Sequence, residues 1–297
     1  MKLFARLTGL VALMFLVFSS LQAQVMIVSK TDRADSKNNS TETVYVDKDR
    51  VCMESQGTKE HTVAVYRPGP LIWIMDLGEG TYMEMNAQDI EQMKAMSKKM
   101  KSQMDEQQKQ MAPQMEQAQK MMEEQMKNMT PEQREEMNKY MPKGMMNMTG
   151  EPEKTVYKKV ASGVKIGNWT CDKYEGYRGK EKVEDVWSTN FSSFGVSPDD
   201  LRVFEEFGKL FEGFGDEEKS AAFKIGSKEF EEEQGYPGVS VKTINYFNGK
   251  VQSTEEVVKV EKKSSFEDGL FQLRPNLKKT ANPMDQMKGS QMPPGMQ

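Results

Sequence analysis

Apolar and polar residues alternate along two stretches of the chain, one before residue 86 and one after residue 150. A period of two is typical of β-strands with one face buried. Leu71-Ile72-Trp73-Ile74-Met75 is apolar at every position, which predicts a strand covered on both faces. Asn248-Gly249 predicts a tight type I′ hairpin turn. The expected strands are 25–28, 43–46, 51–54, 62–66, 71–75, 81–85, 155–160, 164–174, 182–189, 239–246 and 250–262.

The pattern changes between residues 86 and 148, where methionine is almost the only large apolar residue. Its spacing of three and four, and the Gln, Glu, Lys and Ala residues between, predict a helix with one Met-rich face. Asn86 is expected to cap its start, with Asp89 three residues on. Pro113 is expected to kink or break it, and Thr130 to begin a new piece, giving two or three helical pieces in all.

A second helix is predicted over residues 197–214. Ser197 supplies a cap and Pro198 suits the first helical position. Its apolar residues recur at helical spacing and are expected to cover the concave side of the sheet: Leu201, Phe204, Phe207, Phe211 and Phe214. The predicted fold class is therefore α+β, a curved antiparallel half-barrel with a covering helix and a long Met-rich helical insertion.

Residues 1–23 have the form of a signal peptide, with Lys2 and Arg6 before an apolar run and a cleavage site before Gln24. The mature chain is expected to be periplasmic or secreted, with no transmembrane segment. Four further parts are predicted. They are 24–85 and 149–279, two parts of one sheet domain, the helical insertion 86–148, and a disordered tail at 280–297, rich in Met, Pro and Gly.

Composition excludes several function classes. The net charge is -4 and the pI about 5.5 with no basic cluster, so nucleic acid is not an expected partner. The sequence has 1 His, His61, with no nucleophile-elbow motif and no Gly-rich phosphate loop. The chain is therefore not predicted to be an enzyme, and no cofactor is expected apart from the copper considered below.

The sequence has 2 Cys, Cys52 and Cys171. An oxidising compartment favours a disulfide between them. Two free buried thiols are the alternative. A redox-active pair is disfavoured because there is no Cys-x-x-Cys motif.

Four tracts carry a resemblance to a known family: Gly167-Asn168-Trp169-Thr170-Cys171-Asp172-Lys173-Tyr174, Val183-Glu184-Asp185-Val186-Trp187, Gly235-Tyr236-Pro237-Gly238 and Asp268-Gly269-Leu270-Phe271-Gln272-Leu273. The chain resembles the secreted bacterial group named domain of unknown function 4412 over roughly residues 25–85 and 150–279. It departs from the family at Arg274-Pro275-Asn276-Leu277, where a Pro-x-Gly-Tyr-like tract is usual. The resemblance implies a relationship to the periplasmic lipoprotein-carrier fold, with an apolar cavity between sheet and helix.

Three functions stay open at this point. The first is binding of an apolar ligand or an exposed polypeptide, in a cavity or on the Met-rich face; a filled core is the alternative reading of the aromatic residues. The second is Cu(I) binding by thioethers, and the third is a scaffold for an envelope protein. Candidate ligand residues are Trp73, Trp169, Trp187, Phe204, Phe207 and Phe211. Candidate copper ligands are Met83, Met85, Met93, Met96, Met145, Met146 and Met148.

Overall fold

The computed structural model describes residues 24–34, 39–58, 60–128, 130, 154–210 and 224–282. Within the long helix, the side chains of residues 108, 112–120 and 122–128 are not described. The predicted signal peptide, the helical piece predicted from Thr130, and the predicted disordered tail lie wholly or partly outside these ranges. So do Phe211, Phe214, Met145, Met146 and Met148.

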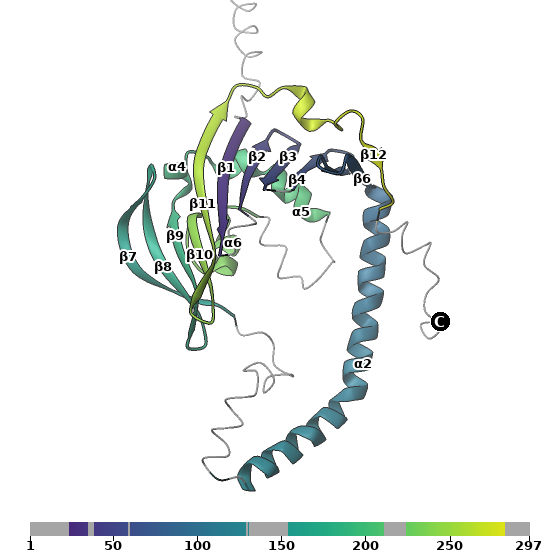
Figure 1. Cartoon of the computed structure of the whole chain (residues 1–297), viewed down its shortest axis with the longest axis vertical. Coiled ribbons are helices and arrows are strands. Elements are labelled where there is room, and N and C mark those ends of the chain that lie inside the picture. Colours follow the sequence, from purple (N-terminus) through teal and green to yellow (C-terminus); the bar gives the residue numbers. More distant parts are fainter. Residues whose placement is uncertain are drawn as a thin grey trace, which may run out of the picture.

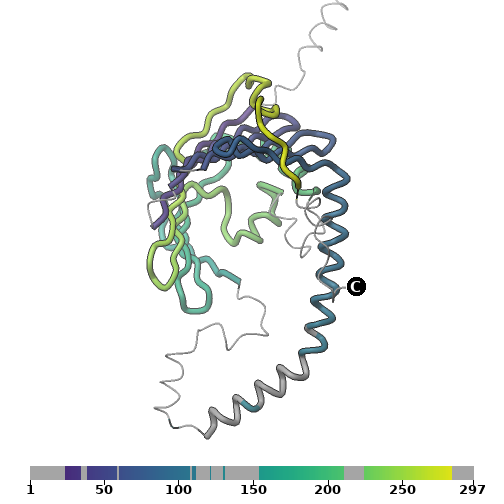
Figure 2. The backbone as a smooth tube through the Cα atoms, turned by 45° about the vertical axis from the view of Figure 1, so that its right-hand side comes forward, coloured from purple at the N-terminus to yellow at the C-terminus, as the bar shows by residue number. Residues whose placement is uncertain are grey.

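Twelve strands form one open sheet in the order β12-β6-β5-β4-β3-β2-β1-β11-β10-β9-β8-β7. Neighbouring strands are antiparallel except for β12 and β6. The sheet is strongly curved (Figures 1 and 2), so the predicted α+β class and curved antiparallel sheet are confirmed. Its strands are β1 Gln24–Arg33, β2 Ser40–Val46, β3 Val51–Gly57, β4 His61–Arg67, β5 Leu71–Asp76, β6 Thr81–Asn86, β7 Val156–Ile166, β8 Trp169–Arg178, β9 Glu181–Thr189, β10 Val239–Phe247, β11 Lys250–Lys263 and β12 Lys278–Lys279.

The two strand-rich parts of the sequence belong to the same sheet. Strand β1 pairs with β11 from Gln24 opposite Lys263 to Arg33 opposite Ser253. This pairing joins β1–β6 to β7–β11 around the helical insertion. In the β10–β11 hairpin, Asn248 and Gly249 both have positive φ, as the predicted type I′ turn requires.

The prediction of one continuous strand over residues 164–174 is wrong. Strand β7 ends at Ile166 and β8 begins at Trp169, so the chain reverses within that range. Gly167 adopts φ 53, which glycine reaches without the steric cost other residues incur. Alternation of apolar and polar residues continues on both sides of the turn, so the pattern alone did not reveal it.

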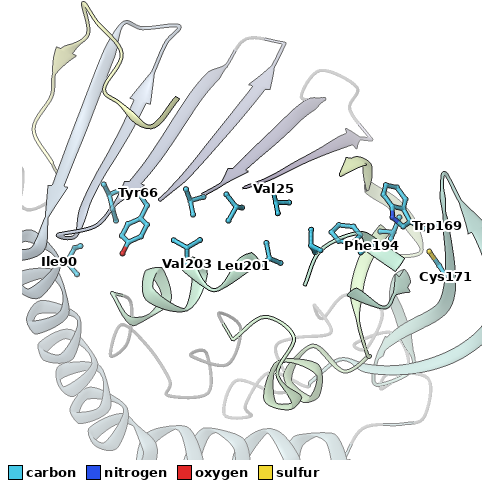
Figure 3. Close-up of a cluster of buried hydrophobic side chains, with 13 residues drawn as sticks. Val25, Tyr66, Ile90, Trp169, Cys171, Phe194, Leu201 and Val203 are labelled. Carbon is cyan, nitrogen blue, oxygen red and sulfur yellow. The ribbon is translucent and has the colours of Figure 1, made fainter. Parts of the chain in front are cut away.

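The inner, concave face carries the larger hydrophobic cluster (Figure 3). Val25, Val46, Val51 and Ile72 reach it from four strands of the sheet. Short helices bring the opposing side chains: α4 Phe191–Phe194, the 3-10 helix η2 Pro198–Leu201, and α5 Val203–Lys209. A further helix, α6 Lys228–Gln234, precedes β10.

The single helix predicted at 197–214 is split in the structure. Ser197 and Asp200 form a capping box that begins η2, as the sequence indicated, but the turn is a 3-10 helix and α5 starts at Val203. Leu201 and Val203 are both buried in the inner cluster. Residues two apart lie on nearly opposite sides of an α-helix, so the interruption is what lets both point the same way.

The outer face carries a second cluster beneath the C-terminal segment. Cys52, Val63, Val65 and Met75 are fully buried there, together with Phe271 from the 3-10 helix η4 Asp268–Phe271. We call residues 264–282 the C-terminal strap, because after η4 this segment runs on to β12 beside β6. Strand β5 contributes to both clusters, which confirms the prediction that it is covered on both faces.

Helix α2 Ala87–Asn128 leaves the sheet directly after β6 and runs away from it (Figure 1). Asn86 accepts hydrogen bonds from the backbone N–H of Gln88 and Asp89, and Asp89 accepts one from the N–H of Asn86, so the predicted cap is present. Of the two outcomes expected at Pro113, a kink or a break, the break does not occur. The helix continues to Asn128 and bends along its length (Figure 1), which accommodates a missing N–H without ending the helix.

Candidate functional site

The part of α2 beyond its first turns stands clear of the sheet domain. Every described side chain from residue 98 to residue 121 is exposed. Four methionines in this span have large exposed fractions: 52% for Met100, 65% for Met104, 53% for Met111 and 56% for Met121. We call residues 98–128 the arm, and these four residues the exposed methionines.

The exposed methionines are apolar side chains that no described part of the chain buries. Burial of a Met side chain is worth roughly 1.5–3 kcal/mol, and less than half of the surface of these four side chains is covered. Lys, Glu and Gln residues around them keep the helix solvated. The arm therefore presents a row of flexible thioethers that gains further free energy when another molecule covers it.

The root of α2 is fixed to the sheet. Ile90 is buried in the inner cluster and so ties the first turns of α2 to the domain. Glu84, on the adjoining strand β6, accepts a hydrogen bond from Trp73 Nε1 at 2.9 Å and forms an ion pair with Lys279 Nζ at 2.8 Å. These contacts lower the pKa of Glu84 below its usual value, Lys279 being the largest cause. The arm thus leaves from a well-anchored corner where β5, β6 and the C-terminal strap meet.

Four of the aromatic residues predicted to line a cavity pack against the inner cluster. Phe207 meets Tyr66 edge-on at 5.3 Å between ring centroids, and Phe204 packs against the same cluster. Trp169 lies 5.8 Å from Phe194 of α4. Trp187 packs there as well, with Lys173 Nζ over its ring at 4.8 Å from the centroid. Ring contacts within one chain of this kind are typical of a filled core.

Trp73 lies on the other face of the sheet. It packs against the outer cluster and is hydrogen-bonded to Glu84. Its neighbours Ile72 and Ile74 belong to the inner face, because successive side chains of a strand alternate between faces. The expectation that Trp73 shares a cavity with the other aromatic candidates is therefore wrong.

Two open hollows lie near the β7–β10 end of the sheet. One, of about 330 Å³, is lined mainly by polar groups, among them Asp172, Ser188 and Asn190. The other, of about 540 Å³, includes Tyr157, whose hydroxyl donates to Glu184. Burial is the largest cause raising the pKa of both Tyr157 and Glu184. Neither hollow is lined by the predicted aromatic ligand residues, so neither matches the apolar cavity implied by the family resemblance.

The predicted disulfide is absent. Cys52 and Cys171 are both free and buried. Their strands, β3 and β8, are six strand spacings apart in the sheet, about 29 Å measured along it, whereas a disulfide needs Cα atoms within about 7 Å. Burial raises the pKa of Cys52 to about 11 and also raises that of Cys171, so both thiols stay protonated and unreactive at neutral pH.

The predicted copper ligands are placed only in part. Met83 and Met85 are two residues apart on β6, so both side chains lie on the same face of the sheet. On that face Met85 packs against the inner cluster. Met93 and Met96 follow in the half-buried first turns of α2. No group of three or more His, Cys, Asp or Glu residues suited to a metal ion occurs among the described residues.

His61 pairs with a single carboxylate at the surface of the sheet. Its Nε2 lies 2.6 Å from Glu54 Oε1 on the neighbouring strand, and both side chains are partly exposed at the sheet surface. In the part of the chain that the structure describes, no helix is both long and apolar enough to cross a bilayer.

Sequence reasoning missed two features of the arm and its root. It did not find Glu84 as the residue that links Trp73 to Lys279, because Glu84 and Lys279 are 195 residues apart along the chain. It also did not single out Met121 among the many methionines of the predicted insertion. The density of Met among Gln, Glu and Lys was the available signal.

No family model matches the chain, and no curated protein matches it. Among solved structures, it is similar to an uncharacterized conserved protein from Thermus thermophilus, with a TM-score of 0.40 and 6% identity over 88% of this chain and 91% of that one. It is also similar to a protein named PNGF-II, with a TM-score of 0.32 and 11% identity over 89% of this chain and 32% of that one. Similarities this low carry no conclusion about function.

Proposed function

We propose that this is a non-enzymatic binding protein of the cell envelope whose arm holds exposed apolar segments of other polypeptides. The observation that carries the proposal is the row of exposed methionines on a helix anchored at its root. Methionine side chains adapt to irregular apolar surfaces, and Met-rich surfaces are used by proteins that bind many different sequences.

The dimensions of the row favour a polypeptide. Met100 and Met121 are 21 residues apart, which corresponds to about 30 Å along a helix. A small ligand would cover only part of that length, whereas a peptide helix or extended segment would cover all of it. Helix-in-groove recognition uses apolar anchors spaced in this way.

The charge of α2 argues against a membrane surface as the occupant. The helix contains seven lysines and seven acidic residues, so it has no net charge. Interfacial helices that bind anionic lipid are rich in Lys and Arg on their polar face. A balanced polar face instead suits partners of either charge.

A lipid inside the half-barrel has less support. The inner face is covered by the chain's own side chains from α4, η2 and α5 (Figure 3). Of the aromatic residues expected around a lipid, those on the inner face contact other side chains of the chain, and Trp73 lies on the outer face. The family resemblance to lipoprotein carriers stays a prediction.

Fluorescence anisotropy with labelled amphipathic peptides tests the proposal. A Leu/Lys peptide and a Leu/Glu peptide are titrated in parallel, so that charge and apolar contact are separated. We expect both to bind, and Met100→Gln with Met104→Gln to weaken both by at least about tenfold, because each buried thioether is worth roughly 1.5–3 kcal/mol. Gln is as good a helix former as Met, so the arm itself is retained.

The matched control lies on the opposite side of the same helix. Ser102 and Lys109 are exposed and point away from Met100 and Met104. Ser102→Gln with Lys109→Gln should leave both affinities within about twofold. Equal losses in the two double variants, or no binding of either peptide by the wild type, would refute the proposal.

Cu(I) binding is the second candidate, motivated by the shared face of Met83 and Met85 near Met93 and Met96 in the chain. Thioethers are soft ligands that suit Cu(I). Titration of the protein with Cu(I) against a competing chelator tests it. An affinity unchanged in Met93→Leu with Met96→Leu argues against these two residues as ligands.

A further inference from the structure

Two groups of described methionines lie at the extremes of accessibility, while others, such as Met93, are half-buried. Met100, Met104, Met111 and Met121 are each more than half exposed, at 52–65%. Met75 is 0% exposed at the centre of the outer cluster, and its Sδ accepts the backbone N–H of Arg274 at 3.4 Å. Since oxidants reach a thioether only through solvent, reactivity should divide along the same line.

The reaction is a two-electron oxygen transfer from a peroxide. The sulfur lone pair attacks one oxygen of hydrogen peroxide, an S–O bond forms and the O–O bond breaks. The proton of the transferred oxygen passes to the departing hydroxide, which leaves as water. Sulfur is oxidised to the sulfoxide and the peroxide is reduced, so hydrogen peroxide is the only co-reactant needed. Methionine sulfoxide reductases reverse the change with two electrons and two protons from a dithiol, which becomes a disulfide while the oxygen leaves as water.

We propose that the exposed methionines are a reversible oxidation site, and that their conversion to sulfoxides releases the bound polypeptide. The sulfoxide is polar and chiral, so it removes the apolar row without removing the helix that carries it. The second half of this inference rests on the proposed polypeptide binding. The first half, selective oxidation of the arm, stands on exposure alone.

Because neither cysteine is a reactive thiol, the methionines are the main targets of hydrogen peroxide in this protein. A reactive cysteine would be oxidised first, because a thiolate is a strong nucleophile. Here Cys52 and Cys171 are buried, and burial raises the pKa of both thiols. Among the described side chains, the exposed methionines of the arm are therefore the most accessible targets of peroxide.

Peptide mapping by mass spectrometry after a timed hydrogen peroxide pulse tests the site. We expect Met100, Met104, Met111 and Met121 to oxidise at least about tenfold faster than Met75, because a fully buried side chain reacts only through rare opening of the sheet. Comparable rates for Met75 and the arm would overturn the proposal. The mapping needs no binding partner, so it tests the selective oxidation of the arm even if no peptide binds.

Peptide binding after oxidation tests the switch. Peroxide-treated wild type should bind the Leu/Lys and Leu/Glu peptides at least about tenfold more weakly than untreated protein, and reductase treatment should restore the affinity. A variant with Leu at all four positions keeps the apolar row and cannot be oxidised there, so its affinity should not change. A variant that loses affinity as the wild type does would overturn the switch. Failure of untreated wild type to bind would overturn the proposed function instead.

Discussion

Phe271→Ala tests whether the C-terminal strap closes the outer face of the sheet. The Phe271 side chain is 0% exposed and packs with Val63, Val65 and Met75. The guanidinium of Arg50 lies 4.5 Å from the centre of its ring. Removing a buried Phe forfeits its transfer free energy and leaves a cavity, together about 3–5 kcal/mol. The lost cation–π contact adds about 0.5–1 kcal/mol.

A loss of this size is a large share of a typical domain stability of about 5–15 kcal/mol. Urea unfolding followed by far-UV circular dichroism should show the midpoint falling by roughly 1–2 M with an unchanged slope. The matched control is Phe247→Ala, because the Phe247 side chain is 66% exposed at the end of β10. Its free energy of unfolding should stay within about 0.5 kcal/mol of wild type. Equal stabilities for the two variants would refute the packing of the strap.

Two further outcomes follow from the buried polar and thiol groups. Asp200→Asn should lower the free energy of unfolding by about 1–2 kcal/mol at pH 7. The Asp200 carboxylate closes the capping box, and its Oδ2 forms an ion pair with Lys262 Nζ at 2.7 Å. Burial alone would raise the pKa of Asp200, but Lys262 and Ser197 outweigh it and hold the pKa below its usual value. The stabilisation is therefore present above about pH 4 and is lost as the pH falls through the folded-state pKa. At that low pH, the free energies of unfolding that urea gives for wild type and variant should become equal. Folded protein should show no alkylation of Cys52 or Cys171 at pH 7 and no mass change on reduction, and a gain of two hydrogens on reduction would contradict free thiols.

The sequence was sufficient for local structure wherever short-range chemistry decides it. Alternation identified the strands, Asn248-Gly249 identified a hairpin, and Asn86 identified the start of α2. Each of these depends on residues within a few positions of one another. The turn at Gly167 was missed because a single glycine between two alternating runs is a weak local signal.

The sequence predicted that the candidate site is a Met-rich helix, but not which of its methionines are exposed. Methionine spacing identified a helix with a Met-rich face, while exposure separates Met104, which is largely in solvent, from the half-buried Met93. Exposure depends on where the sheet ends relative to the helix, and no local pattern encodes that distance. The same limit applies to Trp73, which was expected in an inner cavity although its strand turns that side chain outward.

Sequence by itself determined the strand periods, the caps and the sulfur-rich helix, because those follow from side chains acting on their own neighbourhood. Only the tertiary structure decided that β1 joins β11, that Cys52 and Cys171 lie too far apart to bridge, and that the arm stands away from the sheet. These outcomes depend on contacts between residues more than a hundred positions apart. Such contacts are selected by the burial of the whole sheet, which no single stretch of the chain specifies.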